Sequence, residues 1–371
     1  MQRLAFLLFF LLPFTGLAQY TITGKVINST DKTPVVNASV FLNNAVAGTK
    51  TDDKGNYTIT NVRPGQYDMV TSILGYQTAH QDVMVNGDIK MADIVLSPQV
   101  MMLKEVKIKS NGNWKKDYEK FKRYFFGESS FAGQCRILNK DLPDILDLEY
   151  NIGTMTFTAS STDYLEIENR GLGYKIRYLL NDLTYDARSG SFYYEGTAAF
   201  EELTGSASQQ RKWKKNRISA YEGSSMQFLR SVVSNSITHN GFKVLRLINK
   251  SDTAHSSSQG RGFRTLVDVP LNVNDFVRLT DIKGEYALAF KDQLYVMYNK
   301  KKAHLGNTST KEWASKGWDT ALITTLIFNQ QYAFFDNNGI IINPQSVSFD
   351  GNWGHRLAAE LLPVDYVPDS Q

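Results

Sequence analysis

Residues 48–78 read GTKTDDKGNYTITNVRPGQYDMVTSILGYQT and decide the fold of the first part of the chain. Two turn-forming clusters, Asp52–Asn56 and Arg63–Gly65, separate short runs in which apolar and polar residues alternate. Alternation with a period of two is typical of strands, and Gly, Pro, Asn and Asp mark the turns between them. The stretch therefore predicts a series of short strands joined by tight turns.

The same pattern continues on both sides of this stretch. Tyr20–Ile27 alternates cleanly, residues 35–42 form a second apolar run, and Ile94–Leu96 closes the series. Seven short strands in under 80 residues predict a β-sandwich over residues 19–97. Asp52–Asn56 has a superficial likeness to a calcium loop, but it is too short for the twelve-residue EF-hand loop with its terminal Glu. We interpret it as a hairpin turn.

These residues carry a family resemblance. The blocks TGKVIN (23–28), TPVVNASVFLNN (33–44) and residues 48–78 follow one another in an order that resembles the carboxypeptidase regulatory-like domain. Members of that family have a transthyretin-like (prealbumin-like) sandwich. They occur as accessory modules in zinc carboxypeptidases and at the N-termini of many bacterial outer-membrane receptors. The resemblance implies a non-catalytic module that packs, spaces or binds.

Residues 1–18 have the three parts of a secretory signal peptide. Arg3 gives a positive start, Leu4–Leu12 is a continuous apolar run, and Gly16 and Ala18 are small residues that favour cleavage after Ala18. A membrane anchor is the disfavoured alternative, because a span needs about 20 apolar residues. No later run reaches that length, so no transmembrane helix is expected in the mature chain. The sequence predicts an exported protein of the periplasm, the outer membrane or the cell surface.

The composition excludes several classes of protein. The 371 residues include 41 Lys and Arg against 37 Asp and Glu, and this net charge of +4 lacks the concentrated basic character of nucleic-acid binders. Hydrophobic residues make up 42% and aromatic residues 12%, which indicates a folded chain rich in strands. Cys135 is the single cysteine, so neither an intramolecular disulfide nor a cysteine zinc cluster is expected. An exported chain of this size without disulfides is typical of a bacterial envelope protein.

Residues 98–129 are predicted to form a linker strand and an amphipathic helix. Trp114, Tyr118, Phe121 and Phe125 lie at i, i+4, i+7 and i+11, which is helical spacing. The stripe fits a membrane or a partner, but docking on the core of the following domain is favoured.

Residues 130–371 are also rich in strand patterns. Two hairpins are expected, one over residues 286–298 and one over Ala333–Ile342 around the turn Asp336–Gly339. Helices are expected near Ser224–Ser234 and over Trp353–Leu362. The predicted fold class is mainly β, with a seven-stranded prealbumin-like sandwich followed by a larger antiparallel β-rich domain carrying two or three helices. Three blocks, at residues 180–203, 214–232 and 361–370, resemble a recurrent extension found after the regulatory-like domain in exported bacterial proteins, and no activity is established for that extension.

The search for catalytic residues is negative. A zinc carboxypeptidase needs a His-x-x-Glu pair and a distant His, and none of the five histidines has Asp or Glu three residues later. Cys135 precedes Arg136, which could favour a thiolate, but a packed cysteine is the better interpretation. We therefore predict no catalytic residue, metal site or cofactor.

Three clusters remain as candidate binding sites, each with a structural alternative. A candidate cleft comprises Arg217, Tyr221, Glu222, Ser225, Arg230, Glu201 and Glu202. Its alternative is a buried polar network. A candidate anion-binding run comprises Arg211, Lys212, Lys214 and Lys215, and its alternative is a solvated loop leading to a helix. Trp313, Trp318 and Trp353 are candidates for stacking on sugars, with burial in the core as the alternative.

The sequence favours an exported, non-catalytic envelope protein that binds or scaffolds a protein partner or a surface glycan. Peripheral association with the outer membrane is compatible with this prediction, and a nucleic-acid partner is not expected. The alternative is a hydrolase with its site in the second domain, around Arg217, Glu222 and Glu201. A polar cleft with perturbed carboxylates would favour the hydrolase, and a flat or apolar surface would favour binding.

Overall fold

The computed structural model describes residues 19–99, 114–188, 191–250, 263–300 and 322–368. The predicted signal peptide and the predicted linker strand lie outside these residues. The chain divides into two compact units, one of residues 1–40 and 47–100, the other of residues 41–46 and 101–371. Strands dominate both, which confirms the predicted mainly-β class.

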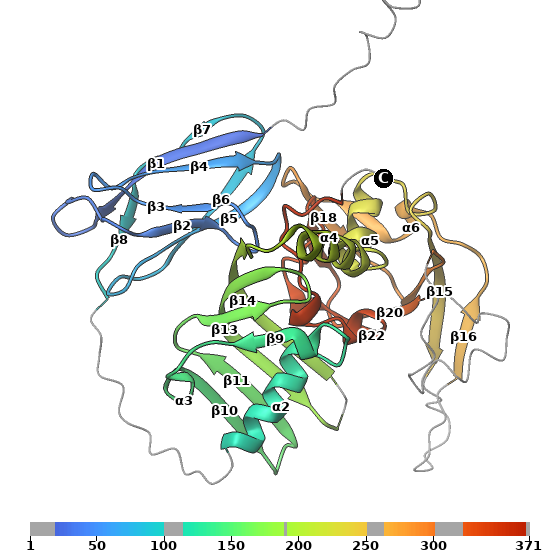
Figure 1. Cartoon of the computed structure of the whole chain (residues 1–371). Coiled ribbons are helices and arrows are strands. Elements are labelled where there is room, and N and C mark those ends of the chain that lie inside the picture. The colour runs from blue at the N-terminus through green and yellow to red at the C-terminus, as the bar shows by residue number, and fades with distance from the viewer. Residues whose placement is uncertain (1–18, 100–113, 189–190, 251–262, 301–321, 369–371) are drawn as a thin grey trace, which may run out of the picture. The chain divides into compact units, whose positions relative to one another are not determined.

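Eight strands between residues 20 and 96 form two sheets, which Figure 1 shows as layers. One sheet has the order β4-β1-β7, with β8 also paired to β1: β1 (Tyr20–Asn28), β4 (Asn56–Val62), β7 (Ile89–Lys90) and β8 (Ile94–Leu96). The other has the order β3-β2-β5-β6: β2 (Ser39–Leu42), β3 (Gly48–Lys50), β5 (Gly65–Ser72) and β6 (Ala79–Val85). The expected count of seven was one too low, because β7 has only two residues and leaves no alternation to detect.

The turn Asp52–Asn56 forms as predicted. The Asp52 carboxylate accepts hydrogen bonds from the backbone N–H groups of Lys54 at 2.9 Å and Asn56 at 2.7 Å. The inward positions of β4 alternate with exposed ones, as the period of two requires. Tyr57 and Ile59, for example, are buried in the core of this sandwich.

The described residues of the second unit form three antiparallel sheets. The six-stranded sheet comprises β9 (Cys135–Ile137), β10 (Leu146–Asn151), β11 (Thr156–Ser161), β12 (Leu165–Asn169), β13 (Tyr174–Asp186) and β14 (Ser191–Glu202). The five-stranded sheet comprises β15 (Phe242–Lys250), β16 (Phe263–Val267), β19 (Gln293–Tyr298), β20 (Leu322–Phe328) and β22 (Val347–Gly351). The three-stranded sheet comprises β17 (Val277–Leu279), β18 (Glu285–Leu288) and β21 (Ala333–Asp336).

Five α-helices occur in the described part of the second unit, and two of them are single turns. They are α2 (Trp114–Phe126), α3 (Leu142–Ile145), α4 (Ala207–Tyr221), α5 (Ser225–Val233) and α6 (Val273–Phe276). Short 3-10 turns are η2 (Ala132–Gln134), η4 (Pro344–Ser346), η5 (Trp353–His355) and η6 (Ala358–Glu360). None of the helices in the described ranges has the length and hydropathy needed to cross a bilayer.

Helix α2 docks on the six-stranded sheet, as the aromatic stripe predicts. Phe121 and Phe125 are fully buried, their ring centroids lie 5.2 Å apart, and they join Phe157 and Tyr178 in one core cluster. A second cluster centres on Phe228 of α5, Phe276 of α6 and Trp353. Helix α5 matches the helix predicted near Ser224–Ser234.

Two local predictions for the second domain are wrong. β18 and β19 do not form a hairpin, because β18 pairs with β17 and β21 while β19 pairs with β15 and β20. Trp353–Leu362 is not one helix, because Arg356 and Leu357 are extended between η5 and η6. The turn Asp336–Gly339 is confirmed, since Gly339 N–H donates to the Asp336 carbonyl and Asp336 N–H donates to the Ile340 carbonyl.

Candidate functional site

The basic run 211–217 belongs to helix α4, where a loop leading to a helix was expected. Ser206 caps the start of the helix: its hydroxyl accepts from Gln209 N–H, while the Gln209 side chain accepts from Ser206 N–H. This reciprocal capping box satisfies two backbone donors at the start of the helix. The run therefore has one face toward the protein and one toward solvent.

The inward face of α4 holds the turn between β12 and β13. Four consecutive backbone carbonyls accept hydrogen bonds from its side chains. Trp213 Nε1 donates to Arg170 O at 2.8 Å, Asn216 Nδ2 to Gly171 O at 2.7 Å, Arg217 Nε to Leu172 O at 2.7 Å, and Arg217 NH2 to Gly173 O at 3.0 Å. Buried carbonyls need such partners, so this face of α4 is a structural clamp on the turn.

Arg217 is the central residue of this clamp. Only 6% of the residue is exposed. Its guanidinium donates to Glu202 Oε1 at 2.7 Å and lies 3.9 Å from the centre of the Tyr174 ring. Burial also raises the pKa of Tyr174, which keeps its hydroxyl neutral. The structure thus brings the buried Arg217 together with Glu202, whose side chain is about half exposed, while Glu201 is exposed as well.

The outward face of α4 carries the predicted anion-binding residues. Arg211, Lys212, Lys214 and Lys215 are all exposed. Helix α4 itself contains no acidic residue. Anion binding by these four residues stays a prediction.

A second arginine of the predicted cleft ties α5 to the end of the chain. Arg230 donates from Nε to Asn338 O at 2.8 Å, from NH1 to Tyr366 O at 2.7 Å and from NH2 to Val364 O at 2.7 Å. Its guanidinium lies 5.6 Å from the centre of the Tyr221 ring. Glu222 closes α4, and its carbonyl accepts from Arg356. Of the seven predicted cleft residues, Ser225 alone lines the pocket described next.

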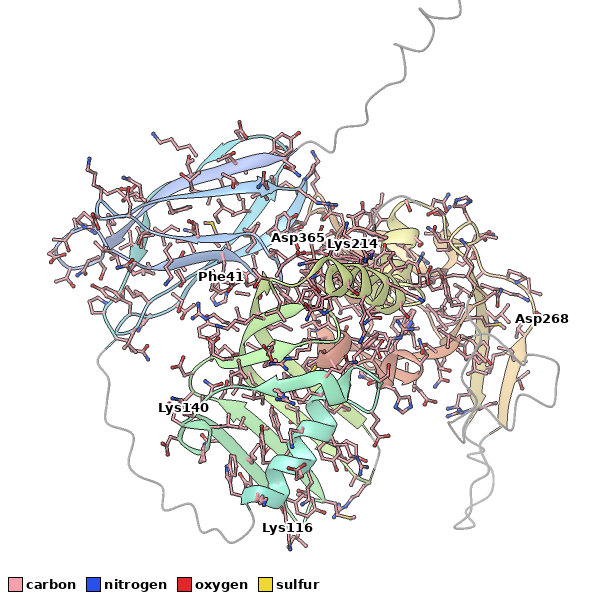
Figure 2. The ribbon with its side chains drawn as sticks, in the orientation of Figure 1. Phe41, Lys116, Lys140, Lys214, Asp268 and Asp365 are labelled. Carbon is pink, nitrogen blue, oxygen red and sulfur yellow. The ribbon has the colours of Figure 1, made fainter. Side chains whose placement is uncertain are left out.

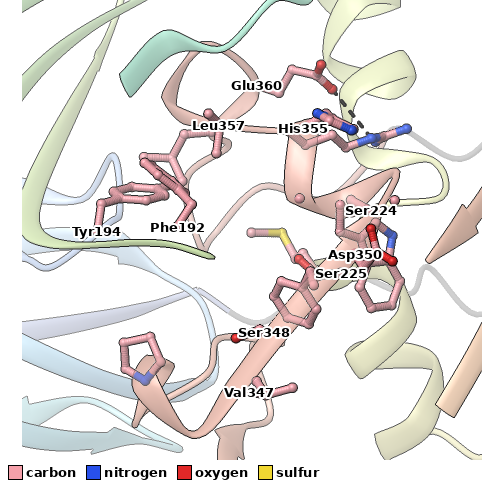
Figure 3. Close-up of a pocket in the computed structure, with 18 of the residues that line it drawn as sticks. Phe192, Tyr194, Ser224, Ser225, Val347, Ser348, Asp350, His355, Leu357 and Glu360 are labelled. Atoms are coloured by element: carbon pink, nitrogen blue, oxygen red, sulfur yellow. Dashed lines mark ion pairs between the residues drawn. The ribbon is translucent and has the colours of Figure 1, made fainter. Parts of the chain in front are cut away.

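A pocket of about 670 Å³ lies within the second unit (Figure 3). It is lined by residues of β14, β22, η5 and η6 and by the start of α5. β14 pairs only with β13 among the named strands, and β22 pairs only with β20, so an edge strand of each large sheet contributes. A volume of this size suits a small molecule or a few sugar rings.

Aromatic and aliphatic side chains form most of the wall. Phe192, Tyr193 and Tyr194 come from β14, and Phe349 comes from β22. All four rings are partly exposed. Burial raises the pKa of Tyr194 to about 12, and that of Tyr193 also to about 12, where the hydroxyl donates to the Glu195 carboxylate. Both hydroxyls therefore stay protonated over the whole physiological range.

Trp353, one of the predicted sugar-stacking residues, belongs mainly to the core. It is 6% exposed, and its Nε1 donates to Gly223 O at 2.7 Å. Its ring packs on Phe228 at 5.3 Å and on Phe349 at 5.4 Å. Trp353 thus forms part of the pocket wall, and its ring packs against Phe349 on the core side. Trp313 and Trp318 lie outside the described residues.

An ion pair marks one end of the pocket, where Figure 3 draws it as a dashed line. Arg356 Nε lies 3.6 Å from Glu360 Oε2, and both side chains are 14% exposed. Arg356 NH1 also donates to Ala220 O at 2.8 Å. Burial lowers the pKa of the Arg356 guanidinium, and Glu360 opposes this shift. A second carboxylate, Asp350, lies 4.0 Å from Arg264 at the wall.

The described residues contain no group of three His, Cys, Asp or Glu side chains that could hold a metal ion. Cys135 is a poor nucleophile, because burial raises the pKa of its thiol to about 12. His355 lines the pocket and is exposed.

Among the described residues, Asp336 is the carboxyl group with a strongly raised pKa; it is the last residue of β21 and does not line the pocket. Burial raises its pKa to about 6, although its carboxylate accepts from Ile340 N–H at 2.8 Å. Between pH 4 and 6 the folded chain keeps a proton that the unfolded chain releases, so stability falls as the pH rises through this window.

Because of Asp336, we expect the free energy of unfolding to fall by about 2 kcal/mol as the pH rises from 4 to 7. Asp336→Asn keeps an acceptor for Ile340 N–H and removes the buried charge. The variant should be more stable than the parent at pH 7 and equal to it near pH 4. Urea unfolding of both proteins at pH 4, 5.5 and 7 checks this, and parallel pH profiles would contradict it.

Comparison with known proteins gives one family-model match, near the start of the chain. Residues 22–108 match the family model of the CarboxypepD_reg-like domain, which confirms the resemblance of this part of the chain. No curated protein sequence matches the chain.

Several solved structures show distant likeness. A candidate carbohydrate-binding protein of Bacteroides uniformis is 9% identical over 85% of this chain and 98% of its own, with a TM-score of 0.19. A candidate membrane-associated protein of unknown function from Bacteroides fragilis is 10% identical over 90% of this chain and 98% of its own, with a TM-score of 0.18. One chain of a cohesin–X-dockerin complex of Acetivibrio cellulolyticus is 19% identical over 21% of this chain, with a TM-score of 0.20, and the match spans 58% of that chain. TM-scores of this size do not establish a common fold.

Proposed function

We propose that this chain is an exported, non-catalytic binding protein of the cell envelope, and that the pocket of its second unit binds a carbohydrate. The observation that carries the proposal is the pocket wall, in which four partly exposed aromatic rings lie near a small number of polar groups. Sugar rings have apolar C–H faces and polar edges, so they fit a site that offers ring faces together with hydrogen-bond donors and acceptors.

The polar groups of the pocket support orientation of a ligand. Ser224, Ser225 and Ser348 offer hydroxyls, and Arg356 with Glu360 offers a fixed pair of opposite charges. Ser224 and Ser225 lie at the start of α5, Ser348 lies on β22, and the ion pair lies at η5 and η6, so polar groups on three parts of the wall favour one pose of a polar ligand.

The charge pattern favours binding over hydrolysis. A glycosidase typically needs two carboxyl groups across the scissile bond, one of them kept protonated. In this pocket Asp350 and Glu360 are each engaged in an ion pair with an arginine. Asp336, whose pKa is raised, does not line the pocket.

The remaining parts of the proposal rest on the sequence and the family match. The signal-peptide pattern of residues 1–18 supports export, and we propose the periplasm or an outer surface as the location. The CarboxypepD_reg-like domain supports a role for the first unit as a spacer or docking module.

Binding of oligosaccharides tests the pocket. Purified mature protein is titrated calorimetrically with xylohexaose, laminarihexaose and tetragalacturonate. We expect at least one to bind, and Phe192→Ala and Phe349→Ala each to weaken that binding about five- to thirtyfold, because each removes a ring face worth about 1–2 kcal/mol. Circular dichroism confirms that the variants remain folded.

Tyr332→Ala is the matched control, because Tyr332 is an exposed aromatic residue of the same unit that does not line the pocket. It should leave the affinity unchanged. Absence of binding at millimolar sugar, or equal weakening by the control, rejects the carbohydrate site. Release of reducing ends during incubation would support the hydrolase instead.

A further inference from the structure

The turn between β10 and β11 presents three apolar side chains to solvent. Tyr150 is 39% exposed, Ile152 80% and Met155 42%, and all three lie within six residues. Leu146 and Leu148, which share the alternating phase of Tyr150 on β10, are buried and half-buried. Apolar exposure thus increases along the strand and is greatest at its tip.

Hydrogen bonds hold this tip in one conformation. Thr154 N–H donates to Asn151 Oδ1 at 3.1 Å, Ala187 N–H donates to the Met155 carbonyl at 3.0 Å, and the Arg188 guanidinium donates to the Gly153 carbonyl. Met155 also has a positive φ of 57°, which is uncommon for a residue of this type. A turn made of polar residues could form the same backbone hydrogen bonds and would expose less apolar surface.

Basic residues lie behind the apolar tip. Lys120 Nζ is 4.4 Å from the centre of the Tyr150 ring, and Arg188 bonds to the turn itself. Lys115 and Lys116 are exposed in the first turn of α2, and Figure 2 shows Lys116 at the same end of the second unit. Acidic residues are present as well. Asp117 pairs with Lys120 at 3.0 Å, and Glu149 is exposed.

We propose that the β10–β11 turn is a contact site for a lipid bilayer. Ile152 and Met155 enter the headgroup region, Tyr150 lies at the interface, and Lys120 and Arg188 face the lipid phosphates. Amphipathic aromatic rings and basic side chains next to apolar ones are the chemistry that suits a membrane interface. This site is independent of the carbohydrate pocket.

The shape of the site favours a bilayer over a protein partner. A stable protein interface buries about 800 Å² on each side, which needs a broad face, whereas these three residues form the end of one hairpin. A bilayer accepts a narrow apolar tip at shallow depth. With only a few basic residues near it, the contact should be weak and reversible, and moderately sensitive to salt.

Vesicle co-sedimentation with the mature protein tests the proposal. Vesicles of phosphatidylglycerol and phosphatidylcholine should pellet a measurable fraction of the protein, and vesicles of phosphatidylcholine alone should pellet at least twofold less. Ile152→Asp should lower the pelleted fraction at least fivefold, because it places a charge where the apolar group enters. Ile152→Trp should raise it.

Leu279→Asp is the matched control, since Leu279 is 83% exposed on β17 in a different sheet. It should pellet like the parent protein. Equal pelleting of Ile152→Asp and the parent overturns the proposal, as does failure of the parent to pellet with either vesicle. Sedimentation without lipid gives a further check: a dimer that Ile152→Asp converts to monomer would assign the tip to self-association and overturn the bilayer contact.

Discussion

Replacing Arg217 with alanine is expected to lower the free energy of unfolding of the second unit by about 3 kcal/mol. The substitution leaves the Leu172 carbonyl without its donor, removes one of two donors from the Gly173 carbonyl, and opens space over the Tyr174 ring. Glu202 is half exposed and regains water, so it adds little to the loss. Urea unfolding followed by tryptophan fluorescence measures the change, because all five tryptophans belong to the second unit.

Arg211→Ala is the matched control for this result. Arg211 is an arginine of the same helix, but it is exposed, so its removal should change stability by less than about 0.5 kcal/mol. Arg217→Lys should recover little of the loss, since a single ammonium group cannot reach both carbonyls and Glu202 with the fork geometry of a guanidinium. A loss below 1 kcal/mol for Arg217→Ala would show that the clamp is not important for stability.

Replacing Gly173 with alanine is expected to be at least as damaging. Gly173 has a φ of 74°, and a Cβ at this position would lie 2.3 Å from Cδ2 of the Trp213 ring. The left-handed backbone costs about 1 kcal/mol for alanine, and moving the indole costs a further 2 kcal/mol or so because its bond to Arg170 O is lost. We expect a total loss of about 3–4 kcal/mol by the same urea measurement.

Gly133→Ala controls for the effect of alanine itself. A Cβ at Gly133 meets no atom within 4 Å, and its backbone is outside the left-handed region. This variant should keep the stability of the parent within about 0.5 kcal/mol. If Gly173→Ala were equally harmless, the close packing of Trp213 on the turn would be disproved.

The sequence was sufficient to predict most of the strands and two of the helices, α2 and α5. Alternation located β1, β4 and β13, and the spacing of four aromatic residues located α2, because each of these elements buries one face against a core. The signal for α4 was also present, since Ser206 and Gln209 form a capping box in the sequence. It was missed because the dense charges of residues 211–217 obscured the inward spacing of Trp213 and Arg217.

Strand pairing was harder to predict than strand position. Residues 286–298 contain two alternating runs and a short polar turn, which is a local hairpin signal. In the structure these runs enter different sheets, because β18 finds partners in β17 and β21 whereas β19 lies between β15 and β20. Partners that lie far apart in sequence decided the pairing, and a local pattern has no information about them.

The candidate site shows the same limit. Arg217, Glu202, Arg230 and Tyr221 were chosen as polar residues in a motif-like block, and the structure places each in a hydrogen-bonded or ring contact within the second unit. The pocket draws its wall from β14, α5, β22 and the turns after it, and the first and last lining residues, Phe192 and Leu362, are 170 positions apart. No single stretch of sequence contains enough of the lining residues for the pocket to be recognised from the sequence.

The clamp on the β12–β13 turn also joins segments that are well separated along the chain. Its four carbonyls receive their donors from residues 43 to 45 positions later in the chain. When the chain emerges with its N-terminus first, from a ribosome or through a membrane, this turn is exposed to water until the residues of α4 have emerged as well. Contacts of such separation slow folding, and for a protein that we propose to be exported, slow folding before translocation is an advantage. The six-stranded sheet then reaches its full stability only after residue 217 has emerged.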